Sequence, residues 1–304
     1  MKFRSFLKGL IWTLVALLFF FHVGAGWYFS DVLIADAFAP DGDPIEMVDG
    51  AAELGLMEVT YQSPLGEFDA WYIPADGDVW VIHVHGKGAT PAEAEPLFGP
   101  LQAAGYPQLS ITYRNDQGQP LDPSGYYQYG VTEWNDVAGA VDFALDNGAT
   151  GIVLYGYSTG AAHILSYIYR YPSSMIRGLV LDSGNFDMGN TVDAEAARRT
   201  LPGVGLPIPP TLTWVAKFIT SLRMGVNWKM IDYIDDAAAL RTPTLLIHGT
   251  ADARVPIEQS RRLAEAAPDA ARFVPFEGAG HVGSYDVDLD RYLAEVLGFL
   301  DRVD

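Results

Sequence analysis

The stretch "GIVLYGYSTGAAHILSY", from Gly151 to Tyr167, joins a strand pattern directly to a helix pattern. Its first seven residues are a short apolar run that is typical of a buried strand, and the residues after Ser158 have helical spacing. Ser158 stands between Gly156 and Gly160, at the point where one pattern changes into the other. We interpret this segment as a tight strand-to-helix turn that exposes one serine at its tip.

The chain on both sides of this turn alternates between strand and helix patterns. Residues 56–77 form two alternating segments joined by Ser63-Pro64-Leu65-Gly66, which predicts an opening hairpin. Alternating strands and helices are typical of a parallel sheet with helices on both faces. We therefore predict an α/β fold with a mostly parallel, eight-stranded sheet. The other six strands are expected within residues 79–86, 106–114, 151–157, 176–182, 243–249 and 271–278.

The alternation is interrupted between residues 183 and 242. This run contains two helical patterns, at residues 191–200 and 210–224, with a proline-rich segment between them. We interpret about 184–242 as a helical cap inserted over the ligand-binding edge of the sheet. Its large apolar residues either line an acyl pocket or pack on the sheet. They are Trp214, Phe218, Ile219, Trp228 and Tyr233.

The N-terminal segment differs in composition from the rest of the chain. Residues 9–30 contain no charged side chain, and a run of this length can cross a hydrocarbon core of roughly 30 Å. Trp27 and Tyr28 fall where interfacial aromatic residues are expected. We predict a transmembrane anchor at residues 1–30, a linker at 31–50 and a globular domain at 51–304.

The charges around the apolar run predict its orientation. By the positive-inside rule, the basic end faces the cytoplasm and the globular domain lies outside. Secretion after signal cleavage is the alternative, because Val23-Gly24-Ala25 and Ala35-Asp36-Ala37 loosely fit a cleavage site. The asymmetry comes from Lys2, Arg4 and Lys8 before the run and from Asp31, Asp36, Asp41 and Asp43 after it.

The composition excludes several classes of function. The 304 residues carry 38 acidic and 19 basic side chains, a net charge of −19, so we expect no nucleic-acid partner. The chain has no cysteine, which excludes disulfides, thiolate metal sites and a cysteine nucleophile. The histidines lack metal-ligand spacing such as HExxH, so we expect neither a metal ion nor a cofactor.

A serine hydroxyl becomes a useful nucleophile only beside a base that a third group orients. His281, in "FEGAGHVGSY", follows the last predicted strand on a glycine-flanked loop and is the favoured base. Asp252, in "HGTADARVP", follows the strand at 243–249 and is the favoured acid. The nucleophile, acid and base then come in the order Ser158, Asp252, His281.

Each of these roles has an alternative. Ser158 is otherwise the N-cap of the following helix, and Asp252 is otherwise part of an Asx turn. Asp182, at the end of the strand at 176–182, is the reserve acid. The other histidines that we weighed are interpreted as packing or capping residues, and they are His22, His83 and His163.

Two backbone amides are expected to stabilise the oxyanion of an acyl-transfer reaction. One belongs to Thr159, the residue after the nucleophile. The other belongs to Lys87 in "HGKG", where His85 and Gly86 would shape the turn after the strand at 79–86. A glycine-containing loop without a catalytic role is the alternative.

The motifs "HGKG", "GYSTG", "GTADARVP" and "GAGH" occur in this order at predicted strand ends. In this respect the chain resembles the α/β-hydrolases, in particular the group that includes Bem46-like esterases and the serine aminopeptidase S33 or monoacylglycerol lipase type. The resemblance covers most of the chain after the linker. It implies a triad of Ser158, Asp252 and His281, with the amides of Lys87 and Thr159 as oxyanion donors.

The chain departs from this group at two places. Thr159 stands where many relatives have Met or Gln, and residues 113–127 replace a compact glycine-rich loop. These departures leave the shape of the acyl pocket open.

Three functions are compatible with these motifs. The first is a membrane-anchored serine hydrolase that cleaves a small-molecule carboxylic ester, with a lipid-like ester as one option. The second is a peptidase or amidase, because the same triad serves both bond types. The third is a catalytically silent binding protein that has kept the fold.

Overall fold

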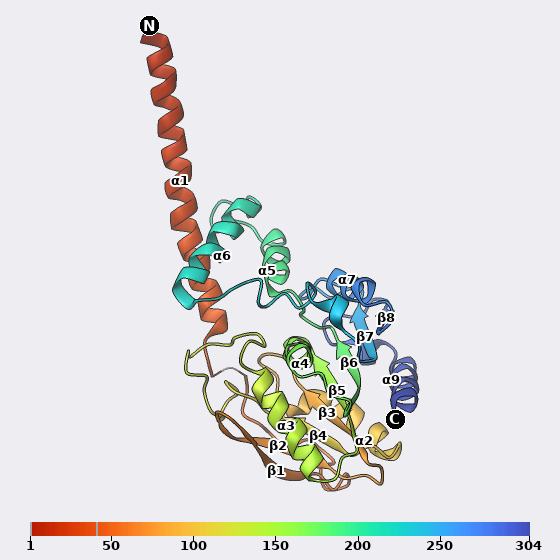
Figure 1. Cartoon of the computed structure of the whole chain (residues 1–304). Helices are drawn as coiled ribbons and strands as arrows, with labels where there is room; N and C mark the ends of the chain where they lie inside the picture. Colours follow the sequence, from red (N-terminus) through yellow and green to blue (C-terminus); the bar gives the residue numbers. More distant parts are fainter. Residues whose placement is uncertain (1, 41) are drawn as a thin grey trace. The chain divides into compact units, whose positions relative to one another are not determined.

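The computed structural model describes residues 2–40 and 42–304 (Figure 1). Met1 and Asp41, which fall within the predicted anchor and linker, lie outside the described residues. The chain forms two compact units, described separately below. The N-terminal unit comprises the residues up to Ala37 and Gly189–Trp228, and the sheet unit comprises Phe38–Met188 and Lys229–Asp304. The predicted domain boundaries and the position of the cap over the sheet edge remain predictions.

Eight strands of the described chain form one sheet, in the order β1-β2-β4-β3-β5-β6-β7-β8. The hairpin β1–β2 and the β2–β4 pair are antiparallel, and every other neighbouring pair is parallel. The predicted α/β class and mostly parallel sheet are therefore confirmed. The strands are β1 (Met57–Ser63), β2 (Gly66–Ile73), β3 (Val79–Val84), β4 (Gln108–Ile111), β5 (Gly151–Tyr157), β6 (Ile176–Asp182), β7 (Thr244–Gly249) and β8 (Ala271–Phe276).

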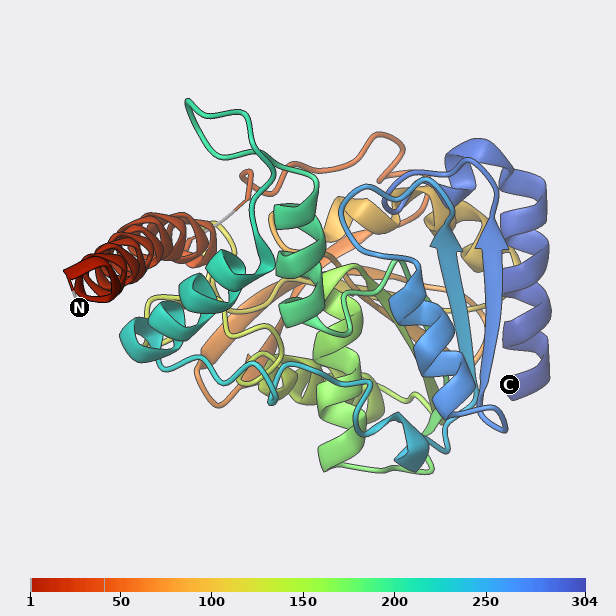
Figure 2. The ribbon, with the colours of Figure 1, turned by 90° about the horizontal axis from the view of Figure 1, so that it is seen from above.

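Helices cover both faces of this sheet (Figure 2). The buried cluster on one face joins α2 (Glu95–Ala103) and α9 (Leu289–Val303) to alternate residues of the central strands, such as Val153 and Tyr155 of β5. On the other face, α3 (Trp134–Asp146) and α4 (Thr159–Arg170) pack on each other and on the sheet. The sheet unit also contains η1 (Pro91–Ala94), η2 (Ala237–Ala239), α7 (Glu258–Ala266) and α8 (Ser284–Val287).

One predicted strand is shorter than its sequence pattern indicates. The pattern at 106–114 yields only the four residues of β4. The chain turns after β4 because Asp116 accepts hydrogen bonds from the backbone N–H of Tyr113 and the ring of His85. Turn formation therefore outcompetes strand propensity at this point.

The N-terminal unit contains α1 (Lys2–Ala37), the larger part of α5 (Met188–Ala197) and α6 (Pro210–Met224). Phe3–Ala37 of α1 is long and apolar enough to cross a membrane, a property that signal sequences share. Helix α6 has the predicted bounds, and it packs along α1 (Figure 1). Ile219 is buried in this unit, Trp228 is half-buried, and Trp214 and Phe218 are exposed.

Candidate active site

Ser158 occupies a strained turn between β5 and α4. Its φ of 48° lies in the left-handed region that non-glycine residues rarely adopt. The flanking glycines permit this turn, because a Cβ on Gly160 would lie 2.1 Å from the carbonyl oxygen of Val84, and one on Gly156 would lie 2.7 Å from the Cα of Ala161. The hydroxyl makes no N-cap hydrogen bond with α4. It is therefore available to another partner.

That partner is His281. The Nε2 atom of His281 lies 2.9 Å from Ser158 Oγ, and its Nδ1 atom lies 2.7 Å from Asp252 Oδ2. A carboxylate can only accept, so Nδ1 carries the proton and Nε2 is free to accept the serine O–H. The structure thus brings the three residues into one hydrogen-bonded chain.

Asp252 is held as a buried carboxylate. Burial alone would raise its pKa, but hydrogen bonds from His248 and His281 outweigh burial and hold the pKa well below its usual range. The backbone N–H groups of Arg254 and Val255 also donate to Asp252 Oδ1, at 2.7 and 2.9 Å. The carboxylate is therefore fixed in both position and charge beside the imidazole.

The carboxyl end of β6 supports both the serine and the histidine loop. Ser158 N–H donates to the carbonyl oxygen of Asp182, and Asn185 N–H donates to that of Ser158. Ser183 Oγ accepts from the N–H of Val282, the residue after His281. One strand end thus fixes the distance between the two reacting side chains.

The carboxyl group of Asp182 has other partners. It accepts hydrogen bonds from the hydroxyls of Tyr292 and Ser183, at 2.7 and 3.0 Å. Burial raises its pKa to about 6, and these hydrogen bonds only partly offset the effect. The structure therefore pairs His281 with Asp252, and the reserve acid lies in a separate buried network.

The histidines that were interpreted as packing or capping residues have other surroundings. His163 is buried against Tyr113, and burial lowers its pKa to about 3. His83 bonds Gln108, and burial lowers its pKa to about 4. Both side chains are thus held neutral in the core, while His22 belongs to α1 in the N-terminal unit.

The turn after β3 lies directly against the serine. A Cβ on Gly86 would come 3.0 Å from Ser158 Cβ. The Gly86 N–H donates to Glu93 Oε2 at 2.7 Å, and the Ala89 N–H donates back to the Gly86 carbonyl at 3.1 Å. Lys87 lies within this turn, and the other expected donor, Thr159, is the first residue of α4.

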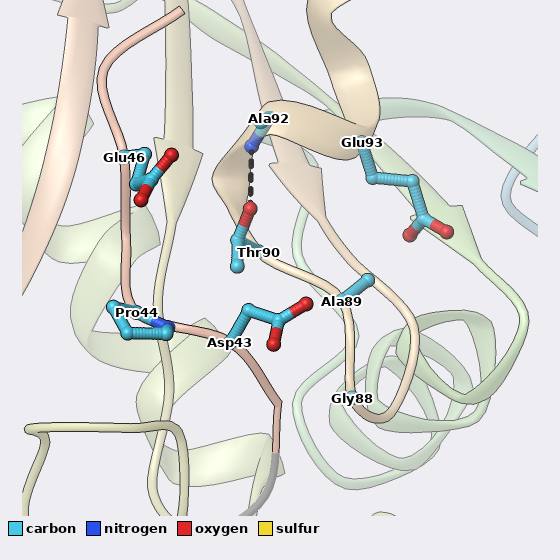
Figure 3. A pocket seen from close by; sticks show the side chains of 8 residues that line it. All are labelled: Asp43, Pro44, Glu46, Gly88, Ala89, Thr90, Ala92 and Glu93. Atoms are coloured by element: carbon cyan, nitrogen blue, oxygen red, sulfur yellow. Dashed lines mark hydrogen bonds between the residues drawn. The ribbon is translucent and has the colours of Figure 1, made fainter.

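A cavity of about 580 Å³ opens beside this turn (Figure 3). Its wall combines the "HGKG" turn and η1 with the segment before β1. Figure 3 shows the carboxylates of Asp43, Glu46 and Glu93 around it. Part of the predicted linker therefore contributes to the surroundings of the turn. The lining residues are Asp43, Pro44, Glu46, Gly88, Ala89, Thr90, Ala92 and Glu93.

Two residues near the site were not identified from the sequence. His248 lies four residues before Asp252 in "HGTAD", a spacing that could have suggested contact across a turn. Glu93 lies seven residues after Gly86, and no sequence signal marks it as a partner of that amide. Within residues 2–40 and 42–304, no group of three His, Cys, Asp or Glu side chains is placed to hold a metal ion.

The sequence of this chain matches a known protein family. A model of the prolyl oligopeptidase family, peptidase S9, matches residues 100–303. The chain belongs to this family. It is 26% identical to the Escherichia coli K12 protein YfhR over 282 residues, which cover 90% of this chain and 86% of YfhR.

Solved structures of esterases share the fold. The Pyrococcus furiosus esterase Pf2001 has a TM-score of 0.66 at 20% identity, covering 88% of this chain and 98% of that one. The Rhodococcus esterase RhEst1 has a TM-score of 0.58 at 18% identity, covering 81% and 99%. The predicted α/β-hydrolase fold is confirmed, and family membership supports an enzyme of the serine hydrolase type. The narrower Bem46-like or S33 resemblance remains a prediction.

Proposed function

We propose that this prolyl oligopeptidase family member is a membrane-anchored serine hydrolase that cleaves carboxylic esters through an acyl-enzyme. The observation that carries the proposal is the hydrogen-bonded chain from Ser158 through His281 to Asp252, with the serine on a strained turn. In this proposal Ser158 is the nucleophile, His281 is the general base, and Asp252 orients the imidazole.

The first half-reaction transfers the acyl group to the enzyme. Ser158 Oγ attacks the carbonyl carbon while its proton passes to His281 Nε2, and the carbonyl oxygen becomes an oxyanion. The backbone N–H groups of Lys87 and Thr159 would donate to this oxyanion. The tetrahedral intermediate collapses when the C–O bond to the alcohol breaks, and His281 returns the proton to the departing alkoxide.

The second half-reaction regenerates the serine. A water molecule gives a proton to His281 Nε2 and attacks the acyl carbon, which forms a second oxyanion at the same amides. The bond to Ser158 Oγ breaks, Oγ takes the proton from His281, and the carboxylic acid leaves. Asp252 remains ionised throughout, since hydrogen bonds hold its pKa well below the usual range despite the opposing effect of burial.

The substrate is proposed to be a small-molecule ester, with a lipid-like ester as one option. The two solved structures described above are named as esterases, which favours an ester. Amide cleavage is the second candidate, because the family is named for an oligopeptidase. The fold does not choose between the two bond types.

Labelling with a fluorophosphonate probe tests the proposal. We expect the full-length protein to be labelled at Ser158, and we expect no labelling of Ser158→Ala. Matched ester and amide substrates with the same acyl group then separate an esterase from an amidase. Folded protein that neither labels nor turns over any of these substrates would support the catalytically silent binding protein instead.

The anchor is part of the proposal. We propose that α1 spans the membrane with its N-terminus in the cytoplasm and the sheet unit outside, on the basis of its length, its apolar composition and the basic residues at its start. Protease treatment of intact cells is expected to digest the sheet unit without lysis. Digestion only after lysis would contradict the topology, and a soluble product that begins near Ala25 or Ala37 would identify a cleaved signal instead.

A further inference from the structure

Helix α6 presents an uncovered apolar stripe. Trp214, Phe218 and Leu222 are spaced four residues apart on one face, and 65%, 52% and 71% of their surfaces are exposed. The rings of Trp214 and Phe218 stack at 5.8 Å. Exposed apolar patches of this kind mark interaction sites more often than ordinary solvent-facing surface.

A neighbouring face of α6 packs on α1, and both helices run in the same direction along the contact. His22 Nε2 bonds Thr211 Oγ1 at 3.0 Å near the start of α6, and Ser30 Oγ accepts from Thr220 Oγ1 at 3.0 Å near its end. Between them Gly26 allows close approach, because a Cβ there would lie 2.6 Å from Val215 Cγ1. Small residues have this role in helix pairs within membranes.

This contact sets the depth of α6 if α1 spans the bilayer. A helix rises 1.5 Å per residue, so about twenty residues counted from Gly9 reach the far boundary of the hydrocarbon near Tyr28. His22 then lies roughly 9 Å inside that boundary. Because Thr211 is bonded to His22, the first turn of α6 lies at the same depth.

The charged side chains of α6 are all paired, which is compatible with this depth. Arg223, at its last turn, pairs with Asp31 at 2.7 Å and lies over the ring of Trp27 at 4.7 Å, an arrangement suited to the membrane–water boundary. Lys217 is paired with Asp193 at 2.6 Å. Both cations of α6 therefore have acidic partners within the N-terminal unit.

The end of α6 that would lie deepest is poor in exposed polar groups. Residues 201–216 contain no charged side chain. Pro209 and Pro210 have no N–H, and the N–H groups of Leu212 and Thr213 bond the Pro209 carbonyl. A helix N-terminus normally leaves several backbone N–H groups without a partner. At this end of α6, few such N–H groups would have to be buried in lipid.

We propose that α6 is a second membrane-contacting element, and that Trp214, Phe218 and Leu222 dock into the headgroup–acyl boundary of the leaflet that also surrounds the C-terminal half of the α1 span. The occupant of this face is the phospholipid bilayer. This inference rests on the proposed membrane anchor. It goes beyond the anchor, because α1 could span the bilayer without any contact between residues 189–228 and lipid. Exposed aromatic side chains are typical of the membrane–water boundary, where Trp and Tyr are enriched.

Site-directed labelling tests the proposal, and the absence of cysteine from the chain makes it direct. Single-cysteine variants of the full chain, Leu17→Cys on α1, Phe218→Cys on α6 and Arg261→Cys on α7, are labelled with a fluorophore and reconstituted into phosphatidylcholine vesicles. Lipids that carry a quencher on the acyl chain then report contact with the bilayer. We expect quenching at Leu17 and at Phe218 to be several-fold above that at Arg261.

The outcomes separate the two proposals. Quenching at Leu17 without quenching at Phe218 would overturn the docking of α6 and leave the anchor intact. A label at Leu17 that lipid quenchers do not reach would overturn the anchor itself. If the Phe218 label is immobilised but not quenched, a second copy of the chain covers the face, and the proposed bilayer contact is wrong.

A second pair of variants separates docking from helix pairing. Gly26→Val introduces a clash with Val215 and should reduce quenching at Phe218 while leaving that at Leu17 unchanged. Gly9→Val, on the same helix where a Cβ would meet nothing within 4 Å, is the matched control and should change neither. Equal quenching in both variants would mean that α6 does not depend on α1 for its contact with lipid, and would overturn the depth argument.

Discussion

Asp252 Oδ2 lies 3.2 Å from Nε2 of His248, four residues earlier in the chain. This is the same carboxylate oxygen that His281 Nδ1 contacts at 2.7 Å. His248 is fully buried, and its Nδ1 atom bonds Ser260 Oγ at 2.7 Å. The acid of the proposed triad is therefore held by a second imidazole that does not touch the serine.

The first prediction follows from this shared oxygen. His248→Ala should lower kcat by about tenfold with little change in KM, because a hydrogen bond to a charged group contributes about 1.5–3 kcal/mol and its loss lets the carboxylate move. His248→Gln, whose amide can donate from a similar position, should recover much of the loss. Equal activity of all three proteins in steady-state assays would show that His248 does not position Asp252.

Ser158→Ala should reduce hydrolysis by about 10⁴-fold or more. His281→Ala should be nearly as damaging, because the serine then lacks its base. Both variants should retain native circular dichroism, since the two side chains are only partly buried. Substantial turnover by Ser158→Ala would require a different nucleophile, and a normal rate for His281→Ala would redirect attention to His163 or His83.

The third prediction compares the two buried acids. Asp252→Asn should lower kcat on the order of 10⁴-fold, because an amide favours the wrong imidazole tautomer. Asp182→Asn should have a much smaller effect, since its carboxyl group is bonded to Tyr292 and Ser183. The measurement is kcat for both variants under one set of conditions. The reverse ranking would assign the acid to the end of β6.

The fourth prediction concerns the "HGKG" turn after β3, which carries Lys87, one of the two proposed oxyanion donors. Glu93→Ala should lower kcat by about tenfold, because the Gly86 N–H loses its acceptor and the turn that carries Lys87 is no longer fixed. Glu93→Gln keeps an acceptor oxygen and should retain kcat. If both variants lose the same activity, the negative charge of Glu93 matters rather than its hydrogen bond.

The residues at strand ends could be predicted from the sequence for a physical reason. The carboxyl ends of parallel strands meet at one edge of a sheet, so the predicted alternation places Ser158 after β5, Asp252 after β7 and His281 after β8 at the same edge. Their mutual hydrogen bonds depend in addition on the loops after β7 and β8, because β6 and β7 lie between β5 and β8 in the sheet. Asp252 and Asp182 both stand at strand ends in the sequence, and it is the structure that pairs His281 with Asp252.

The contacts that the sequence did not predict depend on three-dimensional packing. Glu93 reaches Gly86 only because η1 turns back over the end of β3. The pairing of α1 with α6 joins segments that are about 190 residues apart, such as Ser30 and Thr220. It depends on close approach at Gly26, and periodicity within either helix contains no information about that contact.

The last prediction concerns the dependence of stability on pH. Burial raises the pKa of Asp182 from 3.8 to about 6 in the folded chain, and the unfolded chain keeps the ordinary value. Between these values the folded state holds a proton that the unfolded state has lost, so the free energy of unfolding falls as pH rises through the window. The full effect corresponds to about 3 kcal/mol. Asp182→Asn cannot titrate, so its free energy of unfolding should fall less between pH 4 and pH 6 than that of the wild type. Denaturant unfolding of both proteins in detergent solution at several pH values measures this difference directly, and parallel curves would mean that Asp182 keeps an ordinary pKa in the folded chain.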